Sequence, residues 1–210
     1  MTDVPPMPAG DAVPSFEELA DRLASALPDG DRDEGRALLA ESILPAALSG
    51  LADHPKPRRL AEVVYEDLAE RLAAAAPEER LDALGEAADV AEIRLLSSRA
   101  QSLAVARYLS DDPNAVPRAG IWLDGDADHW RQRPVEEIAA EATRLLDQLE
   151  SWRERIGEER PQLAETRHME YMNAKLALQS ARSGSFGTAA GPLHDFLSDV
   201  GTPGERLDIH

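Results

Sequence analysis

Apolar residues recur in alternating steps of three and four along residues 135–156, and this spacing constrains the fold of the 210-residue chain more than any other feature. The series consists of Val135, Ile138, Ala142, Leu145, Leu149, Trp152 and Ile156. These residues occupy a and d positions over three heptads, which places them on one face of a helix. We therefore predict a long amphipathic helix that begins at Pro134. Its seam is either core packing within the chain or a dimer interface, and the bulk of Trp152 favours a broad bundle.

The rest of the chain has the composition of a helical protein. Hydrophobic residues make up 43% of it, mostly Ala and Leu, whereas aromatic residues make up only 4%. Ala and Leu favour helices, and strands need the β-branched and aromatic residues that are sparse here. Prolines and glycines divide the chain into further helices near 15–28, 33–53, 57–76, 77–109 and 162–182. We predict an all-α fold, a single helical bundle of about six helices with a packed irregular loop at 110–133.

The predicted domain boundaries follow from proline content and apolar patterning. Residues 1–14 hold four prolines and are expected to form a disordered N-terminal arm. The helical bundle domain is expected over 15–200, with a short helix near 193–200, and a flexible tail over 201–210. Ser15 and Glu18 form a capping box at the first helix, and Pro45 is expected to kink or split the second.

Two further helices show apolar faces that we expect to be buried. The helix over 57–76 is expected to bury Leu60, Val63, Val64, Leu68 and Leu72. The helix over 162–182 carries Met169, Met172 and Leu176 on one face, and the two methionines are expected to fill core space. The helix over 77–109 is apolar on several faces, which predicts a central position.

The charge of the chain limits its partners. Its 40 acidic and 22 basic residues give a net charge of −18, which repels nucleic acid and anionic lipid surfaces. This charge suits a basic protein partner, a bound cation or plain solubility, and the partner expected is a protein or a further copy of the chain in a homo-oligomer. There is no cysteine, so disulfides and thiolate chemistry are excluded. No signal peptide or apolar run of membrane-spanning length is recognised, so a cytoplasmic location is expected.

Carboxylates are spaced for metal binding on two neighbouring predicted helices. Asp67 and Glu70 lie three residues apart, as do Glu86 and Asp89, with 15 residues between the two pairs. Each pair shares a helix face, and antiparallel helices can converge such groups on Mg²⁺. The segment resembles the MazG-type all-α nucleotide pyrophosphohydrolases, whose pattern is E-x-x-E followed by E-x-x-D. The resemblance covers about residues 60–95 and implies that the four carboxylates hold Mg²⁺ for hydrolysis of nucleoside triphosphates.

Two other patterns suggest metals without completing a known site. Asp124, Asp126 and Asp128 alternate, as do three aspartates at 29–33, but neither series continues as a calcium loop of the EF-hand kind. Glu165 and His168 form one E-x-x-H, whereas di-iron bundles need two. No nucleophile motif, phosphate loop or dinucleotide fingerprint is present, so no cofactor is expected apart from Mg²⁺ under the pyrophosphohydrolase interpretation.

Three function classes are compatible with the sequence. The favoured one is a non-enzymatic protein-interaction or regulatory module. The second is the Mg²⁺-dependent pyrophosphohydrolase that the carboxylate pairs suggest. The third is an acidic decoy that binds a basic protein surface, which would require the negative charge to gather on one face.

Overall fold

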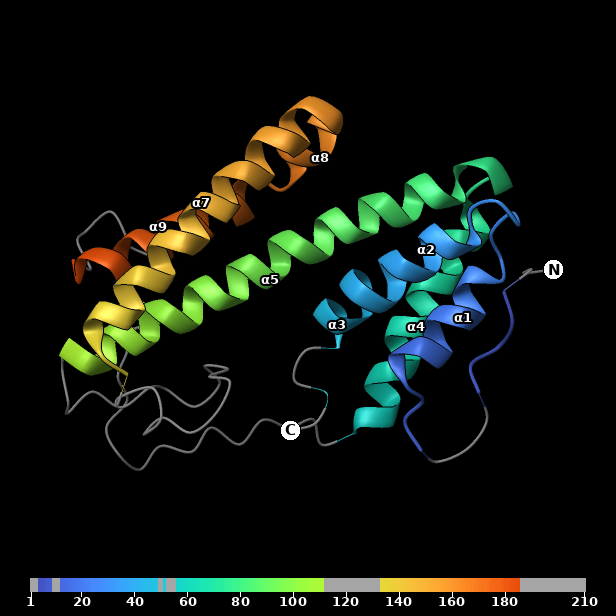
Figure 1. The fold of residues 1–210 in the computed structure, drawn as a ribbon, viewed down its shortest axis with the longest axis horizontal. Coiled ribbons are helices and arrows are strands. Elements are labelled where there is room, and N and C mark those ends of the chain that lie inside the picture. Colours follow the sequence, from blue (N-terminus) through green and yellow to red (C-terminus); the bar gives the residue numbers. More distant parts are fainter. Residues whose placement is uncertain (1–3, 9–11, 49–50, 52–55, 112–132, 186–210) are drawn as a thin grey trace, which may run out of the picture. The chain divides into compact units, whose positions relative to one another are not determined.

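The protein is all-α, as the sequence predicts (Figure 1). The structure, a computed structural model, describes residues 4–8, 12–48, 51, 56–111 and 133–185. Within these residues no strand is present, and no helix is long and apolar enough to cross a membrane. The loop over 112–132 with its three aspartates, the helix expected near 193–200 and the tail lie outside the described residues.

Contacts divide the chain into two compact units. The N-terminal unit comprises Met1–Arg94 and the C-terminal unit comprises Leu95–His210. The division falls inside one helix, α5 (Arg80–Asp111), so no proline, glycine or linker in the sequence marks it.

The N-terminal unit contains α1 (Phe16–Ala24), α2 (Arg32–Leu38), η1 (Leu39–Ile43), α3 (Leu44–Ala47), α4 (Pro57–Ala74), η3 (Pro77–Glu79) and the first part of α5. The predicted cap of α1 is present, because the Ser15 hydroxyl accepts a 3.1 Å hydrogen bond from the backbone N–H of Glu18. Pro57 occupies the first turn of α4, where its missing N–H costs nothing.

Pro45 interrupts the helix that the sequence predicted over 33–53. A π-helical turn, η1, precedes it, and the N–H of Leu44 donates to the carbonyl of Leu39 five residues earlier. Proline lacks an N–H and clashes with the carbonyl four residues before it, so a widened turn at this point accommodates the ring. The predicted kink therefore takes the form of a π turn between α2 and α3.

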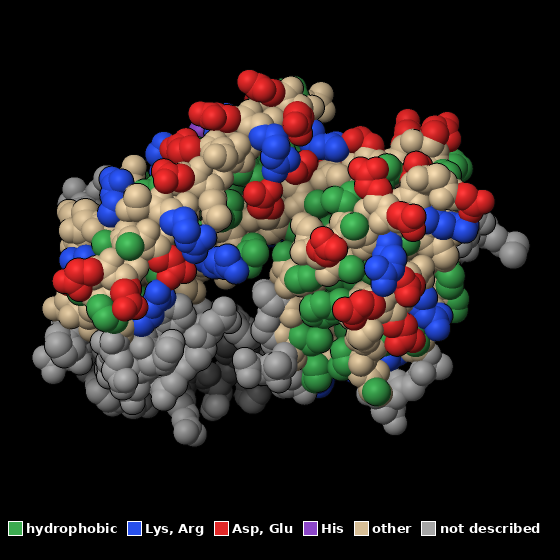
Figure 2. Space-filling view, viewed as in Figure 1, with side chains coloured by type: hydrophobic (Ala, Val, Ile, Leu, Met, Phe, Trp, Pro, Cys, Tyr) green, Lys and Arg blue, Asp and Glu red, His purple; other side chains and the backbone are tan. Residues whose placement is uncertain are grey.

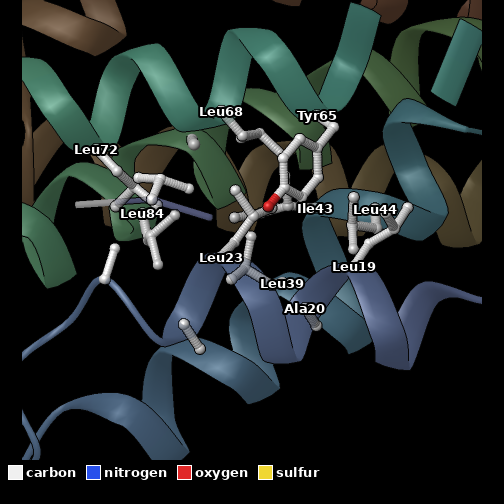
Figure 3. Close-up of a cluster of buried hydrophobic side chains, with 14 of the residues drawn as sticks. Leu19, Ala20, Leu23, Leu39, Ile43, Leu44, Tyr65, Leu68, Leu72 and Leu84 are labelled. Carbon is white, nitrogen blue, oxygen red and sulfur yellow. The ribbon is translucent and has the colours of Figure 1, made fainter. Parts of the chain in front are cut away.

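Leucines of α1, η1, α4 and α5 form the core of the N-terminal unit. Figure 3 shows Tyr65, Leu68 and Leu72 pointing from α4 toward the leucines of α1 and η1. Helix α2 approaches this core closely, because a Cβ on Gly35 would lie 2.1 Å from Leu27 Cδ1. At the same end of the unit the buried Arg80 guanidinium donates to the carbonyl of Ala26 and satisfies a backbone acceptor just beyond α1.

The buried face of α4 differs from the one that the sequence predicted. Ala61, Tyr65, Leu68 and Leu72 are buried, whereas Leu60 and Val64 are partly exposed and Val63 is 48% exposed. At 3.6 residues per turn the predicted apolar face spans about half the helix circumference. One half of that arc reaches the core, and alanine and tyrosine complete the buried stripe.

Part of the segment over 1–14, for which the sequence predicts a disordered arm, lies against the helices where the structure describes it. Val4 and Pro14 are buried, and Met7 and Val13 pack against the core of the unit. The Tyr65 hydroxyl donates a 2.7 Å hydrogen bond to the carbonyl of Pro5. Proline content indicated a segment without helix or strand, and residues 5–8 have neither, but it gave no information on these anchors.

The C-terminal unit contains residues 95–111 of α5 together with α7 (Val135–Glu159), α8 (Pro161–Thr166) and α9 (His168–Ser183). Helices α7 and α9 pack against each other as a helical hairpin. The predicted seam of α7 is buried within the chain from Ile138 to Ile156, with exposures of 0–1%, while Val135 at its start is partly exposed. These positions therefore form core.

Helix α9 buries a face other than the predicted one. Tyr171, Ala174, Ala177, Leu178 and Ala181 are buried, whereas Met172 and Leu176 are partly exposed. Met169 is 66% exposed, so the expectation that it fills core space is wrong. Small alanines let α9 approach α7, and this close packing leaves the longer apolar side chains outside.

Candidate functional site

An apolar groove of about 440 Å³ lies within the N-terminal unit, between α3, α4 and the first part of α5. Its apolar lining comes from all three helices and from the last residue of η1: Ile43, Ala46, Ala47, Val63, Val64, Leu68, Ala87, Val90 and Ala91. Hydrophobic side chains of this unit also reach the surface over α2 and α3 in Figure 2. The volume falls within the range of protein binding sites, about 300–1,000 Å³.

Val63 gives the groove its exposed apolar edge. Among the described residues only two large hydrophobic side chains are exposed, Val63 and Met169. Ile43, Leu68 and Val90 form a nearly buried floor, so the lining passes continuously from core to surface. The part of the predicted apolar arc of α4 that does not reach the core therefore lines the groove, although the sequence assigned the whole arc to the core.

The groove carries charge only on three side chains of its lining, Asp67, Arg71 and Arg94. Asp67 forms an ion pair with Arg71 one turn further along α4, in which Arg71 Nε donates a 2.9 Å hydrogen bond to the carboxylate. Arg94 is exposed and makes no ion pair or side-chain hydrogen bond within the part of the chain that the structure describes. An apolar lining with one unpaired cation at its edge is suited to an apolar surface that bears a carboxylate.

The four carboxylates of the pyrophosphohydrolase pattern lie on the two predicted helices. Asp67 and Glu70 are exposed on α4, and Glu86 is exposed on α5. Asp89, three residues later on α5, is only 8% exposed. Over the described ranges no group of three or more acidic or histidine side chains is arranged to hold a metal ion, and the quartet does not form one. Asp67 instead serves the ion pair with Arg71.

The other sequence patterns have structural roles where the chain is described. Asp29 pairs with Arg32 at 2.7 Å, and Asp31 and Asp33 lie at the N-terminus of α2, where a helix dipole favours negative charge. Glu165 and His168 are both exposed and fall on different helices, because the helix is interrupted at Arg167 between α8 and α9. The His168 ring stacks on Tyr171 at 6.4 Å between centroids.

A polar cluster on the α7–α9 hairpin was not found from the sequence. Tyr171 donates 2.7 Å to one oxygen of Glu150, and Lys175 donates 2.6 Å to the other. The Lys175 and Tyr171 hydrogen bonds lower the pKa of Glu150, and the Glu150 carboxylate raises the pKa of Lys175. Burial, followed by the bond to Glu150, raises the pKa of Tyr171. These hydrogen bonds join the two helices of the hairpin.

Only three-dimensional contacts identify the groove and the Glu150 cluster. The Glu150 cluster joins residues 21 and 25 positions apart, and no local spacing reports such a separation. The sequence held a signal of the groove, since five apolar residues on α4 form an arc too wide for one contact.

No protein-family model, curated protein or solved structure matches the chain.

Proposed function

We propose that the protein is an interaction module whose groove between α3, α4 and α5 binds the apolar face of a helix from a partner protein. The observation that carries the proposal is Val63, a large apolar side chain left 48% exposed at the edge of a lined groove. Fully burying a valine side chain stabilises a complex by about 1.5–3 kcal/mol, so covering the exposed part contributes about half of that.

The chemistry of the lining favours a protein partner over a small polar ligand. Small-molecule sites combine apolar walls with several convergent polar groups that orient the ligand. Here the lining is alanine, valine, leucine and isoleucine apart from three charged side chains, of which Asp67 and Arg71 already pair with each other. Helices bind such grooves through apolar residues at positions i, i+3 or i+4, and i+7.

Arg94 determines the charge expected on the partner near the groove. A carboxylate on the partner helix can pair with this guanidinium at the edge of the apolar contact. The net charge of −18 does not oppose this locally, because at physiological ionic strength charges further than about 8 Å apart are largely screened. We therefore infer a helix with a continuous apolar face flanked by an acidic residue.

Site-directed cross-linking can identify the partner. The chain has no cysteine, so Val63→Cys provides a single thiol for a photoactivatable maleimide in native cell extract. Glu66→Cys is the matched control, because Glu66 is exposed on α4 but absent from the groove. We expect the position 63 probe to attach to a protein that the position 66 probe does not label.

The affinity of the purified partner then tests the proposal. Val63→Glu should weaken binding at least tenfold, because it removes apolar contact and places a carboxylate in the interface. Glu66→Gln should leave the affinity unchanged. Equal effects of the two substitutions, with helical content preserved in circular dichroism, would show that the groove does not bind the partner.

A further inference from the structure

Side chains of α1 and α4 hold the N-terminal arm through its main-chain carbonyls. The Tyr65 hydroxyl donates to Pro5 at 2.7 Å, and Arg22 Nη1 donates to Pro6 at 3.1 Å. Arg58 uses two nitrogens, with Nη2 donating to Pro8 and Nη1 donating 2.7 Å to Ala12. Three side chains on two helices thus bind four carbonyls of one segment, all within the N-terminal unit.

The arm is a ligand of a particular chemical kind. Val4-Pro5-Pro6-Met7-Pro8 has proline at three of five positions, and those residues have no N–H to donate. Proline-rich segments favour the polyproline II conformation, which has no internal hydrogen bonds and leaves its carbonyls available. Donors on the receiving surface are then the natural partners of these carbonyls, as in other proline-rich recognition sites.

The receiving surface is built rather than incidental. Tyr65 is 2% exposed, and burial raises its pKa, so the hydroxyl remains a donor over the physiological pH range. Arg58 Nε donates 3.0 Å to Glu62, which orients its two remaining nitrogens toward the arm. Val4 is buried in the core of the unit and Met7 packs against it, so apolar anchors flank the bonded carbonyls.

We propose that the surface formed by Arg22, Arg58 and Tyr65 is a binding site for proline-rich segments, which the residues 4–8 of the arm occupy within the chain. The ligand in exchange with them is an extended proline-rich segment of a partner protein. The donors contact only main-chain carbonyls, so the site does not require the arm's own side chains beyond an apolar residue at the positions of Val4 and Met7. This site is separate from the groove at Val63 and does not depend on it.

The cost of association favours a foreign segment over the arm of a second copy. Pro14 is buried and Ser15 caps α1, so the chain is fixed immediately after the arm. An arm exchanged between two copies would form the same bonds that it forms within its own chain and would pay the cost of association in addition, so exchange gains nothing over the closed monomer. Residues 4–8 can leave the surface while Pro14 and Ser15 stay in place.

A peptide added in trans tests the site. The probe is a fluorescent peptide with the sequence of residues 2–9, Thr-Asp-Val-Pro-Pro-Met-Pro-Ala. The receptor is the full chain carrying Val4→Asp and Met7→Asp, which release the arm's own anchors. Because a tethered segment competes at an effective concentration on the order of millimolar, we expect anisotropy titrations to show at least tenfold tighter binding to this receptor than to the wild type.

Matched tyrosine substitutions separate specific recognition from loss of fold. Tyr65→Phe in the arm-released receptor removes one hydrogen bond and should weaken the peptide about threefold to tenfold. Tyr171→Phe is the same change in the C-terminal unit and should leave the peptide affinity unchanged. A control peptide with alanine in place of its three prolines should bind more weakly, because it loses the polyproline II preference.

Three results would overturn the proposal. The first is binding to the arm-released receptor no tighter than to the wild type while both retain their helical circular dichroism. The second is equal binding by the Tyr65→Phe and Tyr171→Phe receptors. The third is a concentration-dependent dimer of the wild type that Tyr65→Phe dissociates, because that result would assign the site to the arm of a second copy.

Discussion

Two glycines on helices provide opposite tests of the packing. Gly35 on α2 has no room for a side chain, because a Cβ would lie 2.1 Å from Leu27 Cδ1 and 3.3 Å from Leu84 Cδ1. Gly157 on α7 is exposed and has no atom within 4 Å of an added Cβ. The same substitution by alanine should therefore destabilise the N-terminal unit at one site and stabilise the C-terminal unit at the other.

The magnitudes follow from two opposing terms. Alanine is more favourable than glycine inside a helix by about 1 kcal/mol at either site. At Gly35 the inserted methyl displaces the buried side chain of Leu27, and such overpacking costs about 1–3 kcal/mol. A contact of 2.1 Å belongs at the upper end of that range. The expected net change is about 2 kcal/mol of destabilisation for Gly35→Ala and about 1 kcal/mol of stabilisation for Gly157→Ala.

Hydrogen exchange measured by mass spectrometry reports each unit separately. Backbone amides of α1 and α2 should exchange about 30-fold faster in Gly35→Ala, and amides of α7 about fivefold more slowly in Gly157→Ala. Equal stabilisation by both substitutions would contradict the close packing of α2 on Leu27 and Leu84.

Three further substitutions or titrations test the charged groups. Because the pKa of Glu150 is lowered in the folded state, its contribution to stability is present above the ordinary glutamate range and is lost as pH falls through the lowered pKa. The stability of Lys175→Met in urea unfolding should therefore depend less on pH in this acidic range than the stability of the wild type. Equal pH dependence of the two proteins would refute the cluster. Arg80→Met should cost about 1–3 kcal/mol in urea unfolding, since it leaves the Ala26 carbonyl without this donor, and an unchanged midpoint would contradict that role. Calorimetric titration with Mg²⁺ should show no binding, because Asp67 pairs with Arg71 and the quartet forms no metal-binding group; binding that Glu86→Gln abolishes would instead support the pyrophosphohydrolase interpretation.

Periodicity predicted the helices well because proline, capping residues and heptad spacing act locally. The seam from Ile138 to Ile156 and the cap at Ser15 are in their predicted places for this reason. Pro45 also disturbs its helix where expected, although the sequence did not specify a π turn. Local rules therefore determined where elements begin and end.

The buried faces were harder to predict because alanine is abundant. On α4 and α9, small residues such as Ala61, Ala174 and Ala181 face the core, where they allow helices to approach closely. Larger residues such as Val63 and Met169 are left on the surface. A pattern that weights side chains by hydrophobicity assigns these positions in the opposite way. The groove was missed for the same reason. It is lined by larger apolar residues that the sequence assigned to the core, where alanine lies instead.

Long-range contacts were not accessible from the sequence. The arm's carbonyls meet Arg58 and Tyr65 across 46 to 60 residues, and no spacing rule connects such positions. The carboxylate pairs illustrate the converse, because their spacing is suited to Mg²⁺ but does not determine whether the two helices bring them together. In the structure Asp89 is buried while Glu86 is exposed on the same helix.

The exposure of Val63 is the most direct test of the interaction groove. The chain contains no cysteine, so single-cysteine variants at positions 63, 66 and 68 give unambiguous thiol labelling rates. Val63→Cys should react with a maleimide within about tenfold of the rate of the exposed Glu66→Cys. Leu68→Cys on the groove floor should react at least 100-fold more slowly than Glu66→Cys, because buried sites react only through opening of the fold. A Val63→Cys rate as slow as that of Leu68→Cys would show that the groove is closed in solution and would contradict the proposed function.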